Sequence, residues 1–243
     1  HLATSQRFAD EVDPCQLWEE SARYYANILT PFSRLVLRKL DDVAKMKLDI
    51  ATIAPSHGVI WRGERDLGAI IEAYRRWASG AAKARVVVVC ESMWGSTAQL
   101  AEALARGVAD EGVEVLVRSL PQADRTDVVK EVLEAKGVLV GSSTHNQHTL
   151  LNIDSFLHDL RGLRFTGKLA AAFGSHGWAG GAVPELEEGL RQSGFDVKTA
   201  DLAIKWAPDA EDLTRAYTFG QVFAQEVKRS LAQPAEPHHG TEA

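Results

Sequence analysis

Short apolar runs alternate with amphipathic segments through most of the chain after residue 85. Apolar runs bounded by turn residues predict buried strands, and the segments between them have the spacing of helices. Helices are expected to begin near Thr97, Thr126, Leu150, Gly181 and Asp209. The expected strands are Val86–Cys90, Glu114–Ser119, Gly137–Gly141, Leu169–Phe173 and Asp196–Ile204. Five such units with right-handed crossovers predict an α/β fold with a doubly wound, five-stranded parallel sheet.

The first 79 residues lack this strict alternation. Asp13 and Pro14 predict a helix start, and a second helical pattern follows Pro31. Leu48–Ala54 is expected to form a strand and Asp66–Ala78 a helix. We therefore expect one unit over residues 1–79 and a second over residues 80–231. Residues 232–243 are polar and rich in proline, which predicts a disordered tail.

The first candidate site is the loop that follows the valine strand. Ser92, Gly95, Ser96 and Thr97 stand between that strand and an amphipathic helix, where backbone N–H groups and the helix dipole favour an anion. The spacing matches neither GxGxxG nor GxxxxGK[ST], and no lysine is present for a triphosphate, so a monophosphate is the better match. The alternative is an ordinary turn in which Ser96 or Thr97 only caps the helix.

Two further loops follow the next buried strands. Residues 142–148 read SSTHNQH and residues 174–183 read GSHGWAGGAV. Loops at the carboxyl ends of neighbouring parallel strands form the ligand crevice of such sheets. Backbone amides and the rings of Trp94, His145, His176 and Trp178 could hold a planar, polar ring. Together the three loops predict a binding site for flavin mononucleotide (FMN).

Charge and composition exclude several other functions. The net charge is −6, and no basic stripe indicates a nucleic-acid partner. No apolar run approaches the ~20 residues of a membrane span. Cys15 and Cys90 are far apart and form no CxxC pair, which suits a reducing compartment and predicts a cytoplasmic protein.

These motifs resemble those of a known family. SMWGST, GVLVGSST and FGSHGWAGGAV are similar to the three FMN loops of flavodiiron proteins, also called A-type flavoproteins. Tyr24–Val36 and Ile53–Arg62 resemble the end of their metallo-β-lactamase-like domain. GSHGW and the run Lys205–Asp209 resemble the flavorubredoxin branch, the anaerobic nitric oxide reductases. The resemblance implies that residues 1–79 are the C-terminal part of a metallo-β-lactamase-like domain, and that a flavodoxin-like FMN domain follows.

The resemblance also implies site residues. Many family members have proline at Ser143 and an apolar residue at His145, so this chain departs from the family pattern at the flavin ring. The implied FMN ligands are Ser92, Met93, Trp94, Gly95, Ser96, Thr97, Ser143, Thr144, His145, Asn146, Gly174, Ser175, His176, Gly177, Trp178 and Gly181.

For iron, the resemblance implies a single ligand in this chain. His57 matches the last histidine of the family's diiron site, whereas the family's HxExDH motif is not found in the sequence. Without the resemblance, His57 reads as an ordinary loop histidine. We therefore expect an incomplete diiron centre and no catalytic residue within the chain.

The resemblance further implies activity and partners. The intact enzyme would reduce nitric oxide to nitrous oxide, dioxygen to water, or both. Its electron donor would be a rubredoxin-type protein or a rubredoxin reductase chain, and it would form a head-to-tail homodimer without nucleic-acid or membrane partners. The alternatives are an autonomous flavodoxin-like electron carrier or FMN-dependent quinone reductase, and a non-redox scaffold that has lost FMN.

Overall fold

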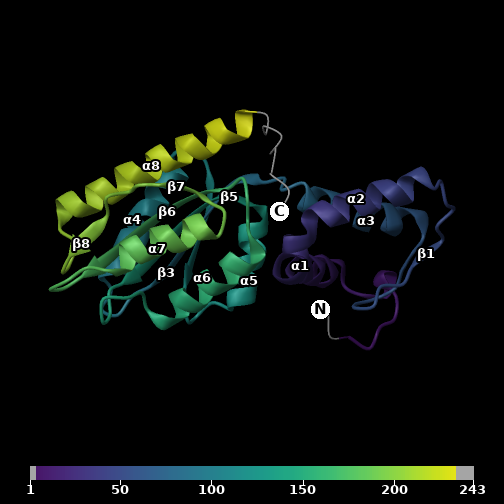
Figure 1. Cartoon of the computed structure of the whole chain (residues 1–243), viewed down its shortest axis with the longest axis horizontal. Coiled ribbons are helices and arrows are strands. Elements are labelled where there is room, and N and C mark those ends of the chain that lie inside the picture. Colours follow the sequence, from purple (N-terminus) through teal and green to yellow (C-terminus); the bar gives the residue numbers. More distant parts are fainter. Residues whose placement is uncertain (1–3, 234–243) are drawn as a thin grey trace.

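A parallel β-sheet forms the centre of the larger part of the molecule (Figure 1). The computed structural model describes residues 4–233. The strand order is β4-β3-β5-β6-β7, and β8 also pairs with β6. Every pairing in this sheet is parallel. The strands are β3 (Lys83–Glu91), β4 (Glu114–Ser119), β5 (Ala135–Ser143), β6 (Leu169–His176), β7 (Asp196–Lys198) and β8 (Ala203–Lys205).

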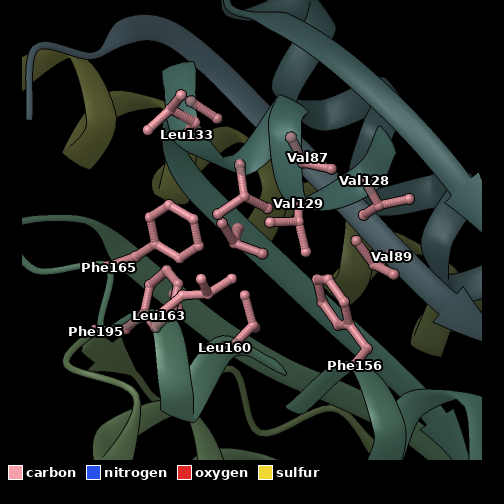
Figure 2. Close-up of a cluster of buried hydrophobic side chains, with 14 of the residues drawn as sticks. Val87, Val89, Val128, Val129, Leu133, Phe156, Leu160, Leu163, Phe165 and Phe195 are labelled. Atoms are coloured by element: carbon pink, nitrogen blue, oxygen red, sulfur yellow. The ribbon is translucent and has the colours of Figure 1, made fainter. Parts of the chain in front are cut away.

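Helices cover both faces of this sheet, which confirms the doubly wound arrangement. Val86 and Val88 of β3 pack in one buried cluster with α4 and α8. Val87 and Val89 pack in the other cluster, with α5, α6 and α7. Figure 2 shows Val87 and Val89 among side chains of that second cluster. Successive side chains of a strand point to opposite faces, so the valine run supplies both cores. The helices are α4 (Ser96–Asp110), α5 (Arg125–Glu134), α6 (Leu151–Leu163), α7 (Ala182–Gln192) and α8 (Ala210–Ala232).

Several helix starts follow from side-chain caps that the sequence supplies. The Asp13 carboxylate accepts from Gln16 N at 3.0 Å, and Pro14 begins α1. Asp209 caps α8 in the same way, accepting from Asp212 N at 2.9 Å. These caps explain why both helices begin where the sequence predicts.

The N-terminal part is mainly helical and lies at one end of the molecule (Figure 1). Its own small core contains Leu17, Trp61 and Ile70. Tyr25 and Trp77 belong instead to the same buried cluster as α5 and α6. The elements are η1 (Ala9–Glu11), α1 (Pro14–Tyr24), η2 (Tyr25–Leu29), η3 (Thr30–Phe32), α2 (Ser33–Lys45), β1 (Thr52–Ile53), β2 (Trp61–Arg62) and α3 (Glu64–Ala78).

Polar contacts also join the two parts. Arg23 Nη2 lies 2.5 Å from Asp127 Oδ1, and the Asn27 amide donates to Thr126 O at 3.1 Å. Lys130 of α5 pairs with Glu19 of α1. The N-terminal helices are therefore packed directly on α5.

Two predicted strands differ from the structure. The strand expected over Leu48–Ala54 is reduced to Thr52–Ile53, because its only pairing in the described part is with the two residues of β2. The strand expected over Asp196–Ile204 is divided into β7 and β8, and Asp201 between them has φ +49°. This left-handed residue turns the backbone, so the two halves pair with different segments of β6.

At the C-terminal end, α8 continues to Ala232, the first residue of the predicted tail. The rest of that tail, from residue 234, lies outside the described residues. No helix within residues 4–233 has the length and apolar character needed to cross a membrane.

Candidate functional site

Three loops lie together at the carboxyl ends of the adjacent strands β3, β5 and β6. The first loop is residues 92–95, the second is 144–150 and the third is 177–181. β3 pairs with β4 on one side and with β5 on the other, so the order in which successive strands are added to the sheet reverses at β3. Such a switch point opens a crevice between neighbouring loops.

The first loop exposes the N-terminus of α4. Gly95 has φ +89°, a conformation that glycine adopts without strain, and its N–H donates to Ser92 Oγ at 3.0 Å. An added Cβ on Gly95 would meet no atom within 4 Å, so the backbone here borders open space. The first N–H groups of a helix have no acceptor within the helix. An anion can therefore approach these groups directly.

Three buried hydroxyl groups connect the loops from beneath. Thr97 is fully buried, and its Oγ1 lies 3.0 Å from Ser143 Oγ and 2.9 Å from Ser175 Oγ. Ser143 Oγ also accepts from Met93 N at 3.2 Å. We call Thr97, Ser143 and Ser175 the hydroxyl cluster. It ties α4 to the ends of β5 and β6, and so sets the spacing of the three loops.

The second loop contains a tight turn. His145 and His148 exchange two backbone hydrogen bonds, each 2.9 Å long. Asn146 and Gln147 between them have φ +51° and +69°, the signs that a type I′ turn requires. This turn leaves His145 and Asn146 exposed at the rim of the crevice.

The second and third loops pack closely against each other. An added Cβ on Gly181 would lie 1.8 Å from Gln147 O, so only glycine fits there. Ala182 N donates to Thr144 Oγ1 at 3.3 Å, and Thr149 N donates to the Glu185 carboxylate at 2.8 Å. The two loops therefore form one wall.

Two of the three loops carry an exposed aromatic ring. Trp94 of the first loop is 89% exposed and Trp178 of the third loop is 90% exposed. Such large apolar rings in water are suited to stacking on a planar ligand. Cys90 at the end of β3 contributes no nucleophile, because burial raises the pKa of its thiol to about 11.

The structure brings the residues of the predicted FMN loops to one edge of the sheet, as expected. Ser143 and Ser175 are only 7% exposed, and their side chains link the loops instead of facing the crevice. A fourth segment also reaches the site and was not among the predicted site residues. It carries Trp206, whose ring packs on Trp178 at a centroid distance of 5.1 Å. A tryptophan directly after a predicted strand was the signal available in the sequence.

His57 lies elsewhere, in the exposed turn between β1 and β2. β1 and β8 are at opposite ends of the molecule (Figure 1), whereas β8 pairs with the strand that carries the third loop. The ring of His57 lies 5.9 Å from that of Tyr24. Within residues 4–233, no three His, Cys, Asp or Glu side chains are grouped as metal ligands would be.

The chain is similar in sequence to two nitric oxide reductases over most of its length. A nitric oxide reductase of Moorella thermoacetica is 47% identical over 228 residues, which are 93% of this chain and 57% of that protein. An anaerobic nitric oxide reductase flavorubredoxin of Escherichia coli is 40% identical, over 93% of this chain and 47% of that protein. The chain thus spans about half the length of the curated relatives it matches.

Two solved structures share the fold of nearly the whole chain. Rubredoxin oxygen:oxidoreductase from Desulfovibrio gigas superposes with a TM-score of 0.90 at 32% identity, covering 96% of this chain and 58% of that one. The flavodiiron protein of Giardia intestinalis superposes with a TM-score of 0.88 at 32% identity, covering 96% of this chain and 57% of that one. Because both matches reach past the sheet domain, they include the N-terminal part, as expected for the end of the β-lactamase-like domain of flavodiiron proteins.

The profile of the flavodoxin family matches residues 88–220, which contain all three loops. This chain therefore belongs to the flavodoxin family, and its homologues include nitric oxide reductases and flavodiiron proteins.

Proposed function

We propose that the three loops bind one FMN, and that the chain is the electron-transfer portion of a flavodiiron oxidoreductase. The observation that carries this proposal is the hydroxyl cluster, which joins three loops at the switch point of the sheet. Flavodoxin-like sheets of this strand order bind FMN at the switch point. The proposed flavin-binding part is residues 80–231.

The first loop fits the phosphate of FMN. Gly95 leaves open space beside the backbone at the start of α4, and the helix dipole favours a negative charge there. The Ser92 and Ser96 hydroxyls are the neighbouring side-chain donors, and Thr97 holds this loop against β5 and β6. A phosphate monoester needs only such donors and no lysine.

The second and third loops fit the isoalloxazine ring. Trp94 and Trp178 supply exposed aromatic faces, and the turn at His145 and Asn146 supplies polar groups for the edge of the ring. Bound FMN would supply one-electron transfer between a donor protein and the site of reduction. The loops' part is to bind this ring, orient it and limit the water around it.

We also propose the activity of the intact protein. It would reduce nitric oxide to nitrous oxide, dioxygen to water, or both. The names of two relatives support these substrates, since one is a nitric oxide reductase and the other a rubredoxin oxygen:oxidoreductase. Within residues 4–233, no three His, Cys, Asp or Glu side chains lie close enough together to hold an iron ion. His57 is proposed as one ligand of a diiron centre completed by other residues.

The proposed electron donor is a rubredoxin-type protein or domain, or a rubredoxin reductase chain. The names of the flavorubredoxin and of the rubredoxin oxygen:oxidoreductase support this choice. We further propose that the intact protein is a head-to-tail homodimer in the cytoplasm. Cys15 and Cys90 of this chain are free thiols, which suits a reducing compartment.

The decisive experiment is a titration of the purified chain with FMN, followed by calorimetry and flavin fluorescence. We expect about one FMN per chain, and weaker binding of riboflavin, which lacks the phosphate. Thr97→Ile should weaken FMN binding by about tenfold or more, because it removes the central hydroxyl of the cluster and adds bulk.

Thr97→Ser is the matched control, since it keeps the hydroxyl that bonds to Ser143 and Ser175. It should bind FMN nearly as well as the wild type. A colourless protein that gives no heat with FMN would rule out the proposal. Equal affinity for riboflavin and FMN would rule out the assignment of the phosphate to the first loop.

A further inference from the structure

The segment after β8 contributes a residue to the site that none of the three loops supplies. Trp206 directly follows β8, and its N–H donates to His176 O at 2.7 Å. Its φ is +66°. Left-handed backbone is strained for a bulky side chain and persists only where its surroundings fix it. A glycine would make the same turn without strain, so the turn alone does not explain a tryptophan here.

Burial in the core does not explain this tryptophan either. Trp206 is 51% exposed. Its ring lies against the third loop, where an added Cβ on Gly177 would come within 2.9 Å of it. The rings of Trp206 and Trp178 are perpendicular, with an interplanar angle of 82° and centroids 5.1 Å apart. The indole of Trp206 therefore supports the third loop and its exposed tryptophan from one side.

We propose that Trp206 is a positioning residue that holds the Trp178 indole in place at the flavin site. An indole that is 90% exposed would otherwise lose conformational freedom when a ligand stacks on it. The edge-to-face contact with Trp206 restricts that freedom before the ligand arrives. The inference rests on the proposed FMN site and adds a specific role for the segment that follows β8.

If Trp206 positions Trp178, it should affect the binding of the flavin ring and of the phosphate differently. Trp206 should affect the affinity for the ring, because it touches Gly177 and Trp178 of the third loop. It should not affect the phosphate, which we assign to the first loop. Riboflavin and FMN should therefore lose affinity by the same factor when Trp206 is removed.

The test measures FMN and riboflavin affinity for the full chain with Trp206→Gly, Trp178→Gly and the double variant. Trp206→Gly should weaken both ligands by about tenfold. Because Trp206 acts through Trp178, the double variant should bind no more weakly than Trp178→Gly alone. Trp206→Phe keeps an aromatic ring on Trp178 and should restore most of the affinity.

Trp18→Phe is the control, since Trp18 pairs with Trp61 in the N-terminal part, at 5.5 Å between ring centroids. It should leave flavin affinity unchanged. Wild-type affinity in Trp206→Gly, or additive losses in the double variant, would overturn the inference while the FMN site stands. A wild-type chain that binds no FMN would overturn both.

Discussion

Lys168 shows at the scale of a single residue how the fold alters side-chain chemistry. It is 3% exposed, and its Nζ donates to Leu133 O at 3.0 Å and to Ala135 O at 2.6 Å. These carbonyls lie at the C-terminal end of α5, where cationic donors are favourable. Burial nevertheless lowers the pKa of Lys168 to about 7 from 10.5, and the charge of Lys136 lowers the pKa further while Glu134 opposes this change.

This pKa shift predicts how stability depends on pH. Between pH 7 and 10.5 the unfolded chain holds a proton on Lys168 that the folded chain has released. The free energy of unfolding contributed by Lys168 should therefore increase as pH rises from 7, and stay constant below it. Lys168→Met should remove this increase. Urea unfolding at pH 6.5, 7.5 and 8.5 measures it.

The pH series ends at 8.5 because the raised pKa of Cys90 acts in the opposite direction at higher pH. At each pH, the free energy of unfolding of Lys168→Met is subtracted from that of the wild type. The variant also leaves two backbone carbonyls without their donor, which lowers stability by a similar amount at every pH. Parallel wild-type and variant curves would show that Lys168 does not titrate in this range.

At the scale of elements, the site depends on how closely the second and third loops approach. Gly181 precedes α7, and an added Cβ would overlap Gln147 O of the second loop. That oxygen belongs to backbone in a left-handed turn, so it cannot move aside as a flexible side chain would. Position 181 therefore requires glycine because the second loop lies so close to it. The backbone angles of Gly181 do not impose this requirement.

We expect Gly181→Ala to push the two loops apart and weaken FMN binding by more than about tenfold, with a stability loss of about 1–3 kcal/mol. Calorimetric titration and urea unfolding measure the two effects. Gly68→Ala is the matched control, because its added Cβ meets no atom within 4 Å and lies inside α3. That change should raise stability by about 1 kcal/mol and leave FMN affinity unaltered. Unchanged FMN binding in Gly181→Ala would mean that this contact does not shape the site.

At the scale of the whole molecule, the two parts share one buried cluster. Tyr25 is fully buried, and its ring packs on Tyr74 and Trp77, with centroids 5.3 Å away in each case. The same cluster continues through Val128 and Phe156 to the sheet (Figure 2). Unfolding of the N-terminal helices would expose apolar surface of α5 and α6. The division at residue 79 therefore stays a prediction about domain boundaries, and cooperative unfolding is expected across it.

Tyr25→Ala should lower the free energy of unfolding by about 3–5 kcal/mol, the cost of removing a large buried ring. Tyr25→Phe removes only the hydroxyl, which lies 3.0 Å from Ser33 Oγ, and should cost about 1 kcal/mol. Hydrogen exchange should show amide protection in β5 falling together with that in α3. If α3 alone loses protection in Tyr25→Ala, the two parts unfold independently.

The sequence alone determined the features that depend on local patterns. The valine run predicts a strand buried on both faces, and Asp13 and Asp209 predict helix starts that the structure confirms. Gly and Ser after three buried strands predict the loops that meet at the sheet edge. Parallel strands bring their carboxyl ends to one edge, so this grouping follows from strand order without knowledge of side-chain contacts.

Only the tertiary structure decided the features that join distant segments. Periodicity says which residues are buried but not which of them meet, so the hydroxyl cluster and the contact of Gly181 with Gln147 could not be predicted. The break at Asp201 and the support that Trp206 gives Trp178 likewise depend on pairing with β6. The packing of Tyr25 against α5 and α6 depends on how the N-terminal helices approach the sheet domain. Each of these contacts joins residues far apart in the chain, whose meeting is set by the placement of whole elements.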